Sequence, residues 1–170
     1  MSGDLRSRLS VAGVGVPACV LVVYVGGPLF AIGLGAVAAI GFWEYASMIR
    51  STGTRVLMPL GAVAALLFPL VMMYGGFPGS ALYSAALLMG FAALAVARIP
   101  LEERPILSAG VTSFGVLYVA GLLSFGVPLR EGWLLVRPIA AEPSEPLART
   151  LFFFYPVVVT WIADTAAYFG

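Results

Sequence analysis

Residues 151–169 read L-F-F-F-Y-P-V-V-V-T-W-I-A-D-T-A-A-Y-F, and this stretch decides the class of fold. A helix needs about 20 apolar residues to cross a bilayer, and this stretch has about that length. Its only formally charged side chain is Asp164. A carboxylate at membrane depth is costly, so it almost always faces protein or water and marks a functional site by default. We therefore predict a transmembrane helix that turns Asp164 toward the helix bundle or a polar cleft, not toward lipid.

The rest of the chain has the same apolar character. Hydrophobic residues make up 61% of the 170 residues and charged residues 10%, whereas a soluble domain carries roughly 25% charge. The long apolar runs predict an all-α, polytopic integral membrane protein with about six transmembrane helices in one transmembrane helical domain, residues 1–170. The predicted spans are residues 9–25, 28–49, 56–74, 77–97, 108–127 and 151–169.

Glycine, proline and charge mark the breaks between these spans. Residues 26–28 (G-G-P) and 75–78 (G-G-F-P) have the composition of tight turns. Residues 50–55 and 98–105 are predicted to be short charged loops, and residues 126–149 one long proline-rich connector.

Small residues recur at helical spacing in two of the predicted spans. Ala31, Gly35 and Ala39 lie four positions apart in one, and Ala86 and Gly90 in another. Such faces allow helix backbones to approach closely in lipid. The alternative is that Gly and Ala are simply frequent in this chain, and the sequence leaves both interpretations open.

All nine basic residues are arginine, and their placement orients the chain. With a cytoplasmic N-terminus, six arginines lie on the cytoplasmic side and three on the far side, as the positive-inside rule requires. Both chain ends are then cytoplasmic, in the cytoplasmic (inner) membrane, and Asp164 lies about 9 Å from the end of its helix at 1.5 Å per residue. The six are Arg6, Arg8, Arg50, Arg55, Arg98 and Arg104; the three are Arg130, Arg137 and Arg149.

Composition also excludes several classes of function. A net charge of +1 offers no basic patch, so no nucleic-acid partner is expected. The chain has no histidine, which removes histidine metal sites and Ser-His-Asp triads. Its single cysteine, Cys19, cannot form an internal disulfide. Any chemistry must use carboxylates, arginine, hydroxyl groups, the backbone and bound metal.

The first candidate site surrounds Asp164. One face of the predicted helix carries the polar and aromatic side chains Trp161, Asp164, Thr165 and Tyr168, and the opposite face carries alanines that could pack on a neighbouring helix. A carboxylate beside hydroxyl groups suits Mg²⁺, which binds through one or two carboxylates plus waters and substrate phosphates. The alternative is a structural aspartate that pairs with an arginine or a backbone group of another helix.

Glu44, in F-W-E-Y, is the second candidate acid. It lies one helical turn from the predicted interface, between Trp43 and Tyr45, which resemble an aromatic belt. Three interpretations of Glu44 are open. It is a functional acid, or its side chain extends to the membrane interface, or it forms an ion pair with Arg50 or Arg55. Both acids lie near the cytoplasmic ends of their helices, where a soluble substrate would arrive.

Two segments resemble the phosphatidate cytidylyltransferases, also called CDP-diacylglycerol synthases. Val158–Gly170, V-V-T-W-I-A-D-T-A-A-Y-F-G, resembles the Trp-x-x-Asp-x-x-Ala-Tyr stretch of that family, and Phe42–Ala46 resembles its Trp-Glu element. The family converts CTP and phosphatidic acid to CDP-diacylglycerol and pyrophosphate and needs Mg²⁺. The resemblance implies CTP and a membrane lipid as partners, Mg²⁺ as cofactor and Asp164 as the catalytic acid and a Mg²⁺ ligand. The residues around it that would bind substrate are Trp161, Thr165, Tyr168 and Gly170.

The chain also departs from that family. Family members continue into a Ser-Pro-Lys-Lys-like loop and a signature rich in Lys, Asp, His and Gly, whereas this chain has neither lysine nor histidine. We therefore expect it to be the N-terminal portion of such an enzyme, inactive alone. Two other classes stay open: a fragment of a proton- or cation-coupled transporter, and a non-catalytic assembly subunit. Homo-oligomer formation is also left open.

Overall fold

The computed structural model describes the backbone of residues 2–132 and 146–169, and the side chains of residue 13 and residues 15–132 and 146–168. Gly170 and most of the proline-rich connector lie outside the described residues. Within the described ranges the secondary structure is helical throughout, which confirms the all-α fold. The helices are α1 (Ser2–Val25), α2 (Gly27–Ser51), α3 (Met58–Arg98), η1 (Leu101–Glu103), α4 (Pro105–Gly115), η2 (Val116–Gly121), α5 (Leu122–Ser124), α6 (Gly126–Glu131) and α7 (Pro146–Phe169).

Long apolar helices confirm the class of polytopic integral membrane protein. Among the described residues, four helical segments are long and apolar enough to cross a membrane, and a shorter apolar helix covers Gly15–Val25. The four are Gly27–Ser51, Met58–Arg98, Pro105–Glu131 and Pro146–Tyr168. The predicted count of six is therefore approximate, and two of the predicted spans, residues 56–74 and 77–97, fall almost entirely on the 41 residues of α3.

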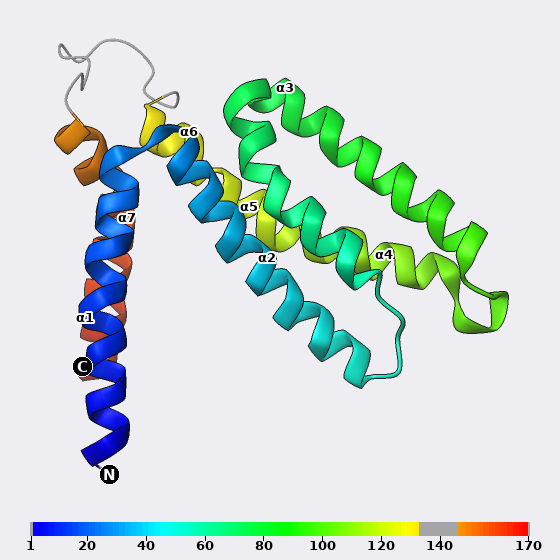
Figure 1. Ribbon diagram of the computed structural model, residues 1–170, viewed down its shortest axis with the longest axis horizontal. Coiled ribbons are helices and arrows are strands. Elements are labelled where there is room, and N and C mark those ends of the chain that lie inside the picture. The colour runs from blue at the N-terminus through cyan, green and yellow to red at the C-terminus, as the bar shows by residue number, and fades with distance from the viewer. Residues whose placement is uncertain (1, 133–145, 170) are drawn as a thin grey trace. The chain divides into compact units, whose positions relative to one another are not determined.

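Gly76 divides α3 into two antiparallel halves, as the bend in Figure 1 shows. Its backbone has φ 59° and ψ −158°, a conformation open only to glycine, so the predicted tight turn at residues 75–78 is confirmed. The halves pack through an edge-to-face contact of Phe68 and Tyr83, whose ring centroids are 5.3 Å apart. The Tyr83 hydroxyl also donates a hydrogen bond of 3.1 Å to the carbonyl oxygen of Ala64.

The chain divides into two compact units. Unit 1 comprises Met1–Phe30 and Leu129–Gly170, and unit 2 comprises Ala31–Pro128. Unit 2 therefore holds most of α2 together with α3, α4, η2 and α5, whereas unit 1 holds α1 and α7. The single-domain organisation predicted from the sequence stays a prediction.

The core of unit 2 explains the F-W-E-Y stretch structurally. Phe42 is fully buried, and a Cβ atom added to Gly61 would overlap its ring. Tyr45 lies over Gly115 in the same way and donates a 3.1 Å hydrogen bond to the carbonyl oxygen of Val111. The two glycines thus provide the space into which the aromatic rings of α2 pack, while Glu44 on the opposite side of the helix is exposed.

The two predicted charged loops meet at one end of unit 2. Arg55, before α3, forms an ion pair with Glu103, after it. At the same end, Thr112 of α4 accepts a hydrogen bond of 3.2 Å from the Leu57 amide and donates one of 2.7 Å to the carbonyl oxygen of Ser108. The side chain of Thr112 therefore satisfies a backbone donor at the start of α3 that the helix itself cannot pair.

The predicted long connector is shorter than the sequence suggested. Residues 126–131 form α6, and α7 begins at Pro146, which suits the first helical position because proline has no amide hydrogen to satisfy there. The prediction of a connector over residues 126–149 was thus wrong at both of its ends, and the middle of that segment lies outside the described residues.

Candidate functional site

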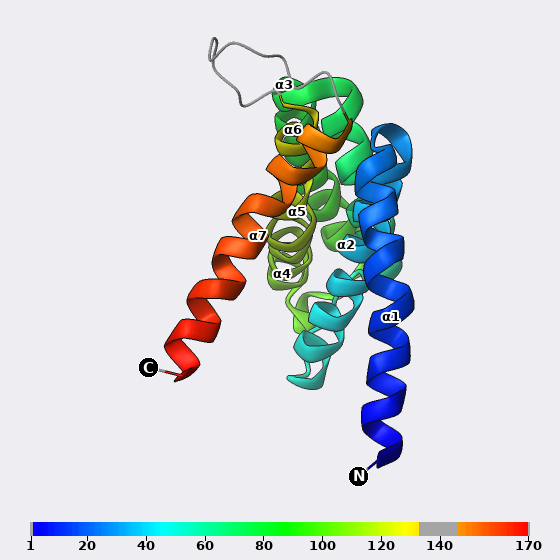
Figure 2. The ribbon, with the colours of Figure 1, turned by 90° about the vertical axis from the view of Figure 1, so that its left-hand side faces the viewer.

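The candidate site lies on α7, the least buried of the four candidate membrane spans. Only 6% of the most apolar 18-residue stretch of α7 is buried, whereas 33% to 39% of the corresponding stretch is buried in the other three candidate spans. Within unit 1, α7 and α1 separate toward the chain ends marked C and N in Figure 2. All side chains of residues 161–168 are exposed, including the alanines predicted to pack on a neighbouring helix. In the described part of the chain, that alanine face is therefore uncovered.

Asp164 is exposed on this helix. In the described part of the chain it has neither an ion pair nor a hydrogen bond from another side chain, so the structural alternative of an Asp–Arg pair is not seen there. The carboxylate is thus available to a ligand. Its orientation toward protein or a polar cleft in the membrane stays a prediction.

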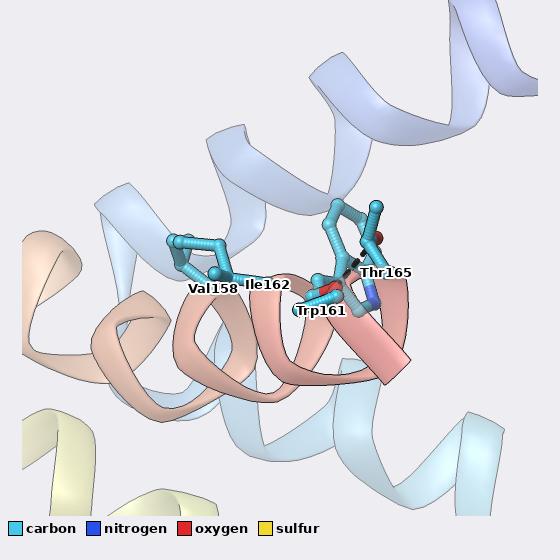
Figure 3. A pocket seen from close by; sticks show the side chains of 5 residues that line it. Val158, Trp161, Ile162 and Thr165 are labelled. Atoms are coloured by element: carbon cyan, nitrogen blue, oxygen red, sulfur yellow. Dashed lines mark hydrogen bonds between the residues drawn. The ribbon is translucent and has the colours of Figure 1, made fainter. Parts of the chain in front are cut away.

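Trp161 and Thr165 lie together beside a shallow hollow of about 430 Å³ on α7. Figure 3 shows them with Val158 and Ile162 along the helix, and Ala166 completes the lining. The Thr165 hydroxyl donates a 2.7 Å hydrogen bond to the Trp161 carbonyl oxygen, so its remaining capacity is as an acceptor. Tyr168 lies farther along the helix with 84% of its surface exposed, and Gly170 lies outside the described residues.

Glu44 does not form the pairs considered from the sequence. Arg55 pairs with Glu103, and Arg50 donates a 3.0 Å hydrogen bond to the sulfur of Met58. Glu44 itself is exposed and has no ion pair among the residues that the structure describes. It belongs to unit 2, whereas Asp164 belongs to unit 1.

The donor set fits a magnesium ion only in part. In the described ranges, no group of three or more His, Cys, Asp or Glu side chains could hold a metal ion. Asp164 offers one exposed carboxylate, and Mg²⁺ commonly takes one or two protein carboxylates while substrate phosphates and waters complete its shell. Asp164 therefore fits as a single ligand of a substrate-bound ion.

A buried charged cluster in unit 1 was missed from the sequence, because its members lie in what was predicted to be a connector. Arg130 has 4% of its surface exposed, and its guanidinium donates hydrogen bonds of 3.0 Å and 2.8 Å to the carbonyl oxygens of Val23 and Tyr24 at the end of α1. It also pairs with Glu131 at 2.9 Å. The third member is Arg149 of α7, whose Nη1 lies 3.4 Å from Glu131 Oε2.

Glycine at position 26 makes room for this cluster. Gly26 has φ +68°, and a Cβ atom there would overlap the guanidinium of Arg130. The next amide, that of Gly27, donates a 3.3 Å hydrogen bond to Glu131 Oε1. The glycine pair at residues 26–27 and the Arg-Glu pair at residues 130–131 were the sequence features that could have indicated this cluster. No local pattern, however, indicated that residues 104 positions apart would meet.

Comparison with known protein families gives a match. The model of a family described as the cytidylyltransferase family matches residues 6–170, a range that includes both Glu44 and Asp164. No curated protein and no solved structure matches the chain.

Proposed function

The chain belongs to the cytidylyltransferase family, and we propose that this membrane transferase converts CTP and phosphatidic acid to CDP-diacylglycerol and pyrophosphate. The observation that carries the proposal is the family match itself, because it extends over nearly the whole chain and includes the W-I-A-D-T-A-A-Y-F-G stretch. The transporter alternative has no comparable support.

The proposed reaction is a nucleotidyl transfer. A phosphate oxygen of phosphatidic acid attacks the α-phosphorus of CTP, the bond from that phosphorus to the oxygen bridging to the β-phosphate breaks, and pyrophosphate leaves with the electron pair. Such reactions depend on positioning and on compensation of phosphate charge. Magnesium, when bound, would supply that compensation, and Asp164 is the residue that would hold it.

The neighbours of Asp164 have roles that follow from their chemistry. Trp161 lines the hollow on α7 and offers an apolar surface to the glycerol and upper acyl region of the lipid. The Thr165 hydroxyl, which already donates to the Trp161 carbonyl oxygen, can accept a hydrogen bond from a ribose hydroxyl, and Tyr168 carries a hydroxyl group suited to a phosphate or ribose oxygen. Phosphatidic acid keeps its head group at the membrane interface, and the proposed orientation puts Asp164 near the cytoplasmic interface where CTP arrives.

The test is Asp164→Asn in the full-length protein, assayed for CTP-dependent conversion of phosphatidic acid over a range of Mg²⁺ concentrations. Asparagine keeps the shape of the side chain but loses the charge that would hold the ion. We expect turnover to fall by about 100-fold or more, as it does when a charge-stabilising group is removed, with an unchanged melting temperature. Glu102→Gln is the matched control, because it neutralises an exposed carboxylate in the loop after α3.

A different result separates the two interpretations of Asp164. If Asp164 were the partner of a buried arginine, its loss would leave an uncompensated charge and would lower stability. Near-normal turnover together with a lower melting temperature would therefore reject the catalytic assignment. Absence of CDP-diacylglycerol formation by the unmodified protein would reject the proposed substrates.

A further inference from the structure

The charged cluster of unit 1 connects the helix of the candidate site to the turn between α1 and α2. Glu131 is its centre: one carboxylate oxygen accepts from Arg130 and from the Gly27 amide, and the other accepts from Arg149 in the first turn of α7. Arg130 in turn binds the last carbonyl groups of α1. Three stretches of chain, residues 23–27, residues 130–131 and the first turn of α7, thus meet at one carboxylate and one guanidinium.

The side chains of the cluster are largely withdrawn from water, which strengthens their interaction. The side chains of Arg130 and Glu131 are 5% and 17% exposed, and that of Arg149 is 35% exposed. Charges in such surroundings are less screened than surface charges, and a buried ion that loses its partner is strongly disfavoured. Arg130 also uses Nε, Nη1 and Nη2 at once, a fork that lysine cannot reproduce.

Few other contacts hold α7, because so little of its surface is buried. In unit 1, Phe153 of α7 makes an edge-to-face contact with Phe30, at a centroid distance of 5.2 Å, near the same end of the helix. Both contacts lie far from Asp164, which is 15 residues from Arg149, or about 22 Å along a helix at 1.5 Å per residue. A small change of helix angle at Arg149 therefore becomes a large displacement of Asp164.

We propose that Glu131, held in place by Arg130, is a positioning residue that fixes α7 through Arg149 and so sets the place of Asp164. The proposal rests on the proposed function for its catalytic consequence, but its structural part can be tested without activity.

The structural test measures the distance between α1 and α7. Spin labels are attached at Val16→Cys and Ile162→Cys, two exposed positions, in the full-length protein with Cys19 replaced by alanine. We expect one narrow distance distribution with Glu131 and Arg149 intact, a broadened or shifted one in Arg149→Gln and Glu131→Gln, and recovery in Arg149→Lys, which keeps the charge. Arg55→Gln, which breaks the exposed ion pair of unit 2, is the matched control and should leave the distribution unchanged.

The catalytic test uses the same variants without labels. Because misplacement of about 1 Å can cost about 100-fold in rate, we expect kcat in Arg149→Gln to fall about 10-fold or more, with KM for CTP and the melting temperature nearly unchanged, and to recover in Arg149→Lys.

An unchanged distance in both charge-removing variants would overturn the proposal. So would a changed distance with normal kcat, or a lower kcat with an unchanged distance. If the unmodified protein makes no CDP-diacylglycerol, the proposed function fails, whereas the distance measurement still decides whether the cluster holds α7.

Discussion

Gly35 shows how one small residue sets the distance between helices. A Cβ atom at Gly35 of α2 would overlap the carbonyl oxygen of Leu66 in α3, so the two backbones are in direct contact there. The close-packing interpretation of the small residues in this span is thereby confirmed at Gly35. Gly90, in the other small-residue pair, has nothing within 4 Å of its Cβ position and lines a shallow hollow between the halves of α3.

We predict that Gly35→Ala lowers the stability of the protein in detergent by about 1–3 kcal/mol, because a backbone oxygen cannot move aside as a flexible side chain can. Gly90→Ala is the matched control. It adds the same methyl group to a helix in open space and should be neutral or stabilising by up to about 1 kcal/mol. Thermal unfolding of both variants measures the difference, and equal melting temperatures would show that α2 and α3 do not touch at Gly35.

The α3 hairpin shows why a long helical segment need not be one span. Its 41 residues would extend about 60 Å as a straight helix, twice the thickness of the hydrocarbon core. The bend at Gly76 returns the chain, and the contacts of Tyr83 with Phe68 and Ala64 close the hairpin. Since φ is positive at Gly76 and not at Gly75, only one of the two adjacent glycines is required by the backbone.

Gly76→Ala is therefore expected to destabilise the hairpin by about 1–3 kcal/mol, the cost of forcing a side chain into a conformation that only glycine adopts readily. Gly75→Ala is the control, because its Cβ would meet nothing within 4 Å and its φ is not positive. The measurement is the melting temperature in detergent. A loss of stability in Gly75→Ala as large as that in Gly76→Ala would contradict this account of the turn.

Each unit brings together the loops that the arginine pattern had placed on one side of the membrane. In unit 2, Arg55 and Glu103 join the loops on either side of α3. In unit 1, Glu131 joins the turn after α1 to the first turn of α7. These pairings agree with the prediction that successive loops lie on alternating sides of the membrane. Which of the two sides faces the cytoplasm stays a prediction.

We predict that cysteines at Thr52 and Glu102 are labelled from the cytoplasmic side only, and a cysteine at Gly75 from the outside only, since six of nine arginines lie on the proposed cytoplasmic side. The experiment uses a membrane-impermeant maleimide on sealed right-side-out vesicles, in a background with Cys19 replaced. Positions 52 and 102 should behave alike because Arg55 and Glu103 lie at the same end of unit 2. Labelling of either from outside would refute the orientation.

Much of the fold could be predicted because membrane insertion depends on local composition. The span at residues 28–49 matches α2 within two residues at either end, and the turn at residues 75–78 was predicted from its glycines. The predicted span at residues 108–127 contains η2 and α5, but the π-helical geometry of Val116–Gly121 and the extension of helix through α6 were not predicted, because nothing in the local composition marks them. For the candidate site, the sequence indicated Asp164 and its neighbours, but it did not indicate that all side chains of residues 161–168 would be exposed.

Residue chemistry and spacing by themselves determined that this protein is a helical membrane protein, that Asp164 lies in the apolar stretch of residues 151–169, and that this stretch resembles the cytidylyltransferases. The first two properties depend on how each segment partitions between water and lipid, which composition sets, whereas the resemblance rests on matched motif residues. Only the tertiary structure decided that Arg130, Glu131 and Arg149 form a largely buried charged cluster and that Gly35 and Gly61 accommodate a carbonyl oxygen and a ring. Such contacts join residues far apart in the chain, and their partners are selected by packing geometry, which no local pattern encodes.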